Sequence, residues 1–166
     1  GNRRYLLQRL TEECARSGRS GNPFTLLVID LDGFKGINDT HGHAAGDAVL
    51  EGAAALLRHA VRTDDYVARW GGEEFILLFA DTDLEGGRLI AEKIRQLVSE
   101  RSWEFEGRTL SITVTIGACA FDGRVELDEA RPLGRTVEVV IDARNMWTGE
   151  PQRDAHLRSA DFLDVD

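Results

Sequence analysis

The apolar positions of the chain follow two spacings, one typical of helices and the other typical of strands. Intervals of three and four residues predict amphipathic helices over residues 5–16, 45–62 and 84–98. Short apolar or alternating runs predict strands over residues 24–29, 66–70, 75–79 and 110–118. Gly71-Gly72 lies between two of these strands and predicts a tight hairpin turn.

After the first helix, the predicted elements run in the order β-α-β-β-α-β. This order predicts an α+β fold of the ferredoxin-like split βαβ type: a palm-like, antiparallel-rich sheet flanked by helices, with an extra N-terminal helix. In such a sheet the third strand lies between the first two, which are parallel. Asp30, at the end of the first strand, and the hairpin at residues 71–74 are therefore expected at the same edge of the sheet.

Four carboxylates are predicted at that edge: Asp30, Asp32, Glu73 and Glu74. Mg²⁺ takes oxygen ligands and usually only one or two protein carboxylates, which leaves room for substrate phosphates. The competing interpretation is a solvated acidic loop, the common role of acids on a hairpin. Gly71 and Gly72 favour a binding site, because backbone without side chains lets a ligand approach closely.

The segment after the first strand carries groups suited to a guanine nucleotide. Gly33, Phe34 and Lys35 begin a predicted short helix, whose free N–H groups suit a phosphate. Asn38 and Asp47 supply an amide and a carboxylate, which match the acceptors and N–H donors of a guanine edge. Taken singly, Asn38 also fits a turn and Asp47 a first-turn helix charge.

Composition narrows the choice of ligand. The chain has 166 residues, enough for one domain (residues 1–166), with 20 Lys and Arg against 29 Asp and Glu and a formal net charge of −9. Such an acidic surface disfavours a nucleic-acid polymer, but not a small phosphate ligand bridged by a metal ion. No apolar run reaches the ~20 residues of a membrane span, so we expect no membrane contact by this domain.

Cys14 and Cys119 have no CxxC or Cys/His neighbours, which favours buried thiols and a reducing, cytoplasmic location. The sequence starts abruptly at Gly1. We therefore expect an excised domain fused to an upstream sensor region, with a membrane anchor as one option for the parent protein.

Three segments closely resemble the motifs of the GGDEF family of diguanylate cyclases. They read Ile29-Asp30-Leu31-Asp32-Gly33-Phe34-Lys35-Gly36-Ile37-Asn38-Asp39-Thr40-His41-Gly42-His43, Gly46-Asp47 and Arg69-Trp70-Gly71-Gly72-Glu73-Glu74-Phe75. The resemblance covers residues 2–120 and includes Asn2-Arg3-Arg4 before the first helix. Residues 121–166 diverge from the family pattern. No lysine follows Lys93, so the family's C-terminal phosphate-binding lysine is absent.

The resemblance implies a metal-dependent enzyme that condenses two GTP molecules into cyclic di-GMP and releases two pyrophosphates. Mg²⁺ or Mn²⁺ is then held by Asp30, Glu73 and the Leu31 carbonyl, and Glu73 or Glu74 assists as general base. The implied substrate-binding residues are Gly33, Phe34, Lys35, Asn38, Asp47, Gly71 and Gly72, with the first three near the phosphates and Asn38 and Asp47 at guanine. Because each subunit holds one GTP, the resemblance also implies a homodimer.

Arg62 and Asp65 match the family's RxxD motif, which implies a second site where cyclic di-GMP binds and inhibits. A guanidinium suits phosphate or the Hoogsteen edge of guanine. The alternative is a plain charge cluster at a helix end. Lys93 stands where relatives often carry an arginine, which implies partial inhibition.

Three rival functions stay open. A catalytically weak receptor for GTP or cyclic di-GMP fits the divergent tail, whereas the intact Glu73 and Glu74 oppose it. Another nucleotidyl cyclase or a polymerase palm also places paired acids at this edge, but Asn38 and Asp47 favour guanine. A structural dimerisation module leaves the clustered acids and glycines unexplained.

Overall fold

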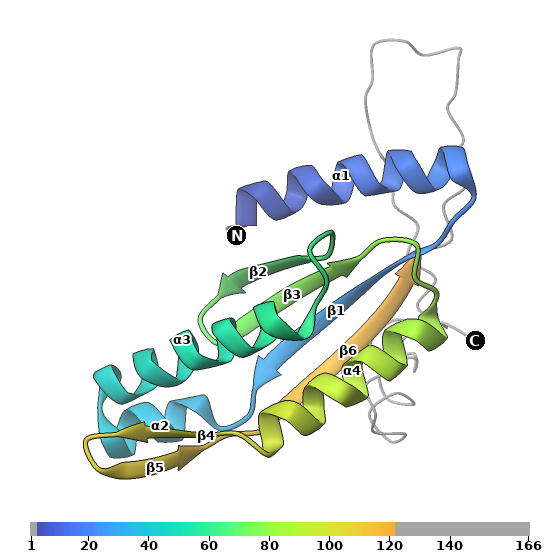
Figure 1. Cartoon of the computed structure of the whole chain (residues 1–166). Helices are drawn as coiled ribbons and strands as arrows, with labels where there is room; N and C mark the ends of the chain where they lie inside the picture. Colours follow the sequence, from blue (N-terminus) through green and yellow to red (C-terminus); the bar gives the residue numbers. More distant parts are fainter. Residues whose placement is uncertain (1–2, 122–166) are drawn as a thin grey trace, which may run out of the picture.

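The structure is a computed structural model that describes residues 3–121 (Figure 1). Its helices are α1 (Arg3–Ser20), α2 (Phe34–His41), α3 (His43–Ala60) and α4 (Leu84–Ser99). Its strands are β1 (Phe24–Leu31), β2 (Tyr66–Gly71), β3 (Glu74–Phe79), β4 (Ser102–Phe105), β5 (Arg108–Ser111) and β6 (Val114–Phe121). The divergent segment lies outside the described residues from position 122 onward, so the assignment of residues 1–166 to one domain stays a prediction.

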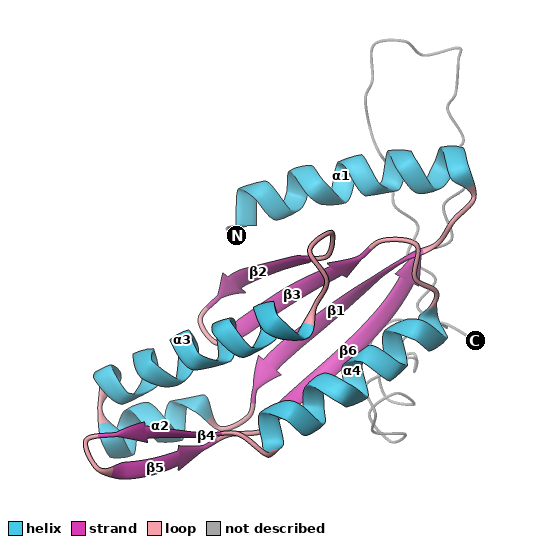
Figure 2. Cartoon of the chain, in the orientation of Figure 1, coloured by secondary structure: helices cyan, strands magenta, loops and turns pink. Residues whose placement is uncertain are grey.

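Four strands form one sheet in the order β2-β3-β1-β6, and β4 and β5 form a separate hairpin (Figure 2). β1 pairs antiparallel with both β3 and β6, and β2 pairs antiparallel with β3. β3 therefore lies between the parallel strands β1 and β2, as the split βαβ order requires. The predicted α+β fold, with helices flanking an antiparallel-rich sheet and α1 as the extra helix, is confirmed.

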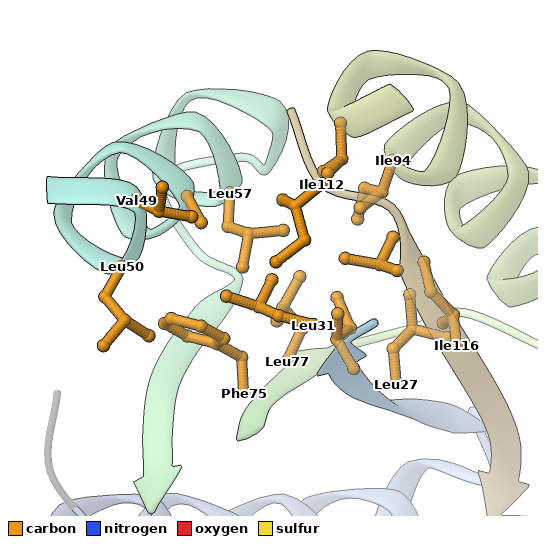
Figure 3. Close-up of a cluster of buried hydrophobic side chains, with 14 of the residues drawn as sticks. Leu27, Leu31, Val49, Leu50, Leu57, Phe75, Leu77, Ile94, Ile112 and Ile116 are labelled. Carbon is orange, nitrogen blue, oxygen red and sulfur yellow. The ribbon is translucent and has the colours of Figure 1, made fainter. Parts of the chain in front are cut away.

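The larger core lies between the sheet and the helices α3 and α4 (Figure 3). Leu27, Ile29 and Leu31 point into this core from β1 and are almost completely buried. Successive side chains of a strand alternate between its two faces. This alternation turns Val28 and Asp30 to the opposite face, where both are exposed.

Helix α1 covers part of that opposite face. Beneath it packs a small apolar cluster of Cys14, Phe24, Leu78 and Phe121. The helix ends where Gly21, at φ +72°, donates its N–H to the Ser17 carbonyl. α1 is thus longer than the predicted residues 5–16, because Gly18 stays within the helix and only Gly21 takes the left-handed conformation that ends it.

The single strand predicted over residues 110–118 is wrong. β5 ends at Ser111 and β6 begins at Val114, and β5 pairs with β4, which was not predicted. The turn between them is Glu106-Gly107, where both residues have positive φ. Trp103 of β4 is buried in the larger core, so this hairpin adds apolar surface that a single strand does not supply.

Two helices also differ from their predictions. α3 ends at Ala60 and not at residue 62. In α4, predicted over residues 84–98, Leu89 and Leu97 follow the helical spacing of apolar residues but are 67% and 37% exposed. The buried face of α4 is narrower than its apolar spacing predicts. It consists of two small residues, Gly87 and Ala91, together with Ile94 and Val98. Among the described residues, no helix has the length and apolar character needed to span a membrane.

Candidate active site

The predicted meeting of Asp30 with the hairpin is present in the structure. Asp30 lies directly opposite Glu74 where β1 pairs with β3. Residues opposed in this way have Cβ atoms about 4.5–5.5 Å apart and share one face of the sheet. Both side chains are exposed, since strand alternation turns them away from the larger core. Two carboxylates distant in sequence are therefore neighbours at the surface.

The electrostatics at Asp30 favour a bound cation. Asp30 is exposed, but partial burial of its carboxyl by neighbouring atoms raises the pKa above its ordinary value, and the charges of Glu73, Glu74 and Asp32 raise it further. A divalent cation relieves such a concentration of negative charge, and carboxylate oxygens are the ligands that hard cations prefer. Within residues 3–121, no cluster of three or more Asp, Glu, His or Cys side chains is placed to hold a metal by itself. The donor set thus fits a cation that takes further oxygen ligands from backbone or substrate.

Asp32 differs from the other three acids. Its two carboxylate oxygens accept hydrogen bonds of 2.7 Å from the hydroxyls of Thr113 and Thr115. Its N–H also donates to the Thr113 carbonyl at 2.9 Å. These bonds tie the end of β1 to the start of β6. Asp32 therefore stabilises this edge of the sheet, and it influences Asp30 through the electrostatic effect of its negative charge.

The hairpin turn is one residue later than predicted. β2 continues through Gly71 and β3 begins at Glu74, so the turn residues are Gly72 and Glu73. Only Gly72 has a left-handed backbone, with φ +49°, and the Arg69 Nε donates to the Gly72 carbonyl at 2.8 Å. A Cβ at Gly71 meets no atom within 4 Å. Glu73 therefore lies at the tip of the hairpin, beside open backbone.

The loop after β1 ends in the predicted short helix. Leu31 is the last residue of β1, and Gly33, at φ +69°, caps α2 without any side-chain hydrogen bond. Phe34 is buried and anchors the first turn, while Lys35 is exposed. The first N–H groups of this helix face a loop that no capping side chain occupies. The start of α2 is thus available to an anion.

The two residues predicted at guanine come from different helices. Asn38 belongs to α2 and Asp47 to α3, and Gly46 brings the helices together. A Cβ on Gly46 lies only 2.1 Å from the Asn38 Oδ1 and 3.1 Å from Phe34 Cζ. The absence of a side chain at Gly46 therefore allows the Asn38 amide to lie against α3 at the residue that precedes Asp47 in the sequence.

A cavity of about 250 Å³ lies between α3 and the β2–β3 hairpin. Its lining combines apolar side chains with two acids and two arginines: Asp47, Leu50, Glu51, Ala54, Arg58, Val67, Arg69 and Phe75. Asp47 thus borders this cavity, whereas Asn38 does not line it. The contributions of Glu51, Arg58 and Arg69 were not predicted. The only sequence signal was the spacing of residues 47, 51, 54 and 58 on one face of α3.

Arg62 and Asp65 form a closed turn between α3 and β2. The Arg62 N–H donates to Asp65 Oδ2 at 2.9 Å, and the Asp65 N–H donates to the Arg62 carbonyl at 3.2 Å. Burial raises the pKa of the Asp65 carboxyl, opposed by the hydrogen bond from Arg62. The Arg62 side chain is exposed. Arg62 is thus a surface residue of a turn closed by its own backbone.

Comparison with known proteins identifies the family. The diguanylate cyclase GGDEF domain family matches residues 1–131. The chain belongs to the GGDEF family of diguanylate cyclases. Diguanylate cyclase DgcP from Pseudomonas aeruginosa is 46% identical over 122 residues, which are 74% of this chain.

Two solved structures extend the comparison of this GGDEF domain to the fold. Diguanylate cyclase SiaD from Pseudomonas aeruginosa, in complex with its activator SiaC, superposes with a TM-score of 0.71 at 38% identity, over 75% of this chain and 48% of that one. The coiled coil and GGDEF domain of DgcB from Caulobacter crescentus, in complex with c-di-GMP, superposes with a TM-score of 0.68 at 31% identity, over 72% of this chain and 64% of that one.

The GGDEF domain is shorter than its curated relatives. It spans 18% of the length of DgcP and 30% and 32% of relatives from Treponema denticola and Caulobacter vibrioides. Family membership therefore establishes which kind of domain this chain forms. The activity, substrates and partners of the protein are proposed in the next subsection.

Proposed function

We propose that the chain is a diguanylate cyclase domain that condenses two GTP molecules into cyclic di-GMP with release of two pyrophosphates. The observation that carries the proposal is the cross-strand pair of Asp30 and Glu74, with Glu73 at the adjoining hairpin tip. Family membership and the intact Gly71-Gly72-Glu73-Glu74-Phe75 sequence support it.

Mg²⁺ or Mn²⁺ is the proposed cofactor, held by Asp30, Glu73 and the Leu31 carbonyl. When bound, the metal polarises the α-phosphate and favours loss of the proton from the attacking ribose 3′-OH. Glu74, which pairs with Asp30, or Glu73, at the hairpin tip, is proposed to accept that proton. The backbone of Gly33, Phe34 and Lys35 binds the phosphates at the start of α2.

Asn38 and Asp47 are proposed to select guanine. The Asn38 amide lies against α3 at Gly46, and Asp47 borders the cavity beside the hairpin. A carboxylate accepts hydrogen bonds from the N–H groups of guanine, whereas adenine offers a different pattern of donors. Gly71 and Gly72 leave the backbone open where the nucleotide passes the hairpin.

Arg62 and Asp65 are proposed to bind cyclic di-GMP as an inhibitor. Their closed turn leaves the Arg62 guanidinium exposed, and a guanidinium recognises phosphate or guanine through paired N–H donors. The DgcB structure contains c-di-GMP, which supports the choice of ligand for the family.

The proposed catalytic species is a homodimer, since each domain supplies one GTP. The reaction draws on GTP, so we place it in the cytoplasm and propose that an upstream sensor region in the parent protein controls it.

The test is to incubate the purified 166-residue chain with GTP and Mg²⁺ and to measure cyclic di-GMP by chromatography and mass spectrometry. Product is expected from the wild type, with loss of about 100-fold or more in Glu73→Gln and Glu74→Gln. Glu12→Gln, an exposed acid on α1, serves as the matched control and should keep full activity.

The same experiment separates the main rival. The absence of lysine after Lys93 favours weak hold on the triphosphate and hence a receptor function. No product at high enzyme concentration, together with a GTP-dependent rise in melting temperature, selects the receptor and contradicts the cyclase.

A further inference from the structure

The first turns of α1 contact β2, the strand that leads into the Gly71-Gly72-Glu73-Glu74 hairpin (Figure 1). The Arg3 guanidinium carbon lies 4.2 Å from the centroid of the Trp70 ring, the distance of a cation–π contact. Tyr5 contacts Tyr66, four residues earlier on the strand, with ring centroids 5.1 Å apart. The first turns of α1 therefore contact β2 near both ends of that strand.

Trp70 is an irregular position in the sheet. Arg69 pairs with Phe75, but Gly71 pairs with Glu74, so β2 contains one more residue than β3 at this point. Trp70 is that extra residue and forms a β-bulge. A bulge bends its strand, and the direction of the bend depends on how the extra residue is held. Gly71, Gly72 and Glu73 follow immediately.

Side chains from two different parts of the chain contact the β2 side of the hairpin. Within the hairpin, the Arg69 Nε donates to the Gly72 carbonyl at 2.8 Å. From outside it, Arg3 lies against the Trp70 ring. Trp70 is half-buried and Arg3 is exposed. A substitution at the N-terminal end of α1 therefore alters the contact between Arg3 and Trp70 and leaves the Arg69–Gly72 hydrogen bond intact.

We infer that Arg3 is a positioning residue for the hairpin, acting through Trp70 and its bulge on the placement of Glu73 relative to Asp30. The pairing of β3 with β1 fixes Glu74 opposite Asp30. Glu73 lies in the turn between β2 and β3, so its position relative to Asp30 depends on the hairpin. The catalytic consequence rests on the proposed function, whereas the structural consequence does not. The effect of removing the cation is expected to be about 2- to 5-fold, the range for a cation–π contact at an exposed site.

The test compares three variants of the full chain. Arg3→Gln removes the cation, Arg3→Lys keeps one, and Arg4→Gln is the matched control on the neighbouring exposed arginine. Nuclear magnetic resonance spectra report the backbone amides of Gly71 and Gly72 and the indole N–H of Trp70. Arg3→Gln should shift all three signals, Arg3→Lys should restore them in part, and Arg4→Gln should leave them unchanged.

Kinetics with GTP and Mg²⁺ supply the second measurement. Arg3→Gln should lower kcat about 2- to 5-fold, with a smaller change in KM for GTP, because Glu73 lies on the hairpin whereas the proposed guanine contacts Asn38 and Asp47 lie on α2 and α3. Equal spectra and equal kcat for Arg3→Gln and Arg4→Gln overturn the inference. If the wild type forms no product, the proposed function fails and the shifts of Gly71 and Gly72 alone decide whether Arg3 positions the hairpin.

Discussion

At the scale of single residues, Asp30 lies where burial and three neighbouring acids all raise the pKa of its carboxyl. A raised pKa means that the folded chain binds this proton more tightly than the unfolded chain does. The stability contributed by Asp30 is therefore present below the ordinary pKa of about 4 and is lost as pH rises through the higher folded value. At neutral pH the ionised carboxylate opposes folding while serving the proposed metal site.

The first prediction concerns Asp30→Asn. This variant removes the ionised carboxylate, so its melting temperature at pH 7 should exceed that of the wild type, and the difference should shrink as pH falls toward about 4. Cyclic di-GMP formation should fall by about 100-fold or more. Thermal unfolding across pH and product assays at pH 7 measure the two effects.

Asp32→Asn is the matched control two residues away. Asp32 accepts hydrogen bonds from Thr113 and Thr115, so this substitution weakens charge-assisted bonds and should lower stability by about 1 kcal/mol at pH 7. A lower melting temperature for both variants contradicts the assignment of opposite roles to the two acids.

The second prediction concerns Gly46→Ala. The new Cβ lies 2.1 Å from Asn38 Oδ1, so the amide must move away from α3. We expect the KM for GTP to rise by about 10-fold, since guanine loses a hydrogen-bonding partner that is held in place. Steady-state kinetics with GTP measure the change.

Gly52→Ala provides the control on the same helix. There the added Cβ meets the buried Trp103 indole and not a proposed ligand contact. This variant should lose about 1–3 kcal/mol of stability, as overpacked cores do, with KM for GTP unchanged. Equal KM increases in both variants contradict a specific role for Gly46 beside Asn38.

At the scale of elements, the sequence predicted what periodicity determines. Helical spacing of apolar residues predicted α3, and a short apolar run predicted β1. The order of the elements then placed β3 between β1 and β2. The β4–β5 hairpin was missed because the alternation over residues 110–118 continues smoothly across the break at residues 112–113. Leu89 follows the apolar spacing of α4 and is nevertheless exposed, because helical spacing predicts the direction of a buried face and not its width.

The same limit applies to the site. Asp30 and Glu74 were predicted to meet because topology alone brings them together. The threonines that bind Asp32 lie more than 80 residues away, and no local pattern identifies them. Glu51, Arg58 and Arg69 converge on the cavity only through the packing of α3 against the hairpin, which is not encoded in the spacing of either element.

The third prediction belongs to the junction of α3 with β2. Arg62→Ala removes the exposed guanidinium while the backbone turn with Asp65 can still form, so cyclic di-GMP should inhibit at least 10-fold less strongly. Lys93→Arg, on the exposed face of α4, adds a planar guanidinium and should strengthen inhibition. Initial rates at increasing product concentration measure both. Unchanged inhibition in Arg62→Ala removes the RxxD site from the proposal.

At the scale of the whole molecule, the fourth prediction follows from one GTP per domain. Specific activity should rise with enzyme concentration and then level off, because dilution separates the domains before catalysis. Activity assays over a dilution series, beside light scattering at the same concentrations, test this. Activity strictly proportional to enzyme concentration down to the lowest dilutions contradicts a transient dimer.

The position of β1 in the sheet determines which part of the proposed metal site unfolds locally first. β1 is hydrogen-bonded along both sides, from Thr25 to Asp30 with β3 and from Phe24 to Leu31 with β6, whereas β2 lies at one end of the described sheet. Local unfolding starts where few bonds must break. Hydrogen–deuterium exchange should therefore label residues 66–74 long before residues 25–30. The proposed metal site is therefore expected to join a side chain on a slowly exchanging strand to one on a rapidly exchanging hairpin, with Glu73 as the acid that adjusts to the nucleotide.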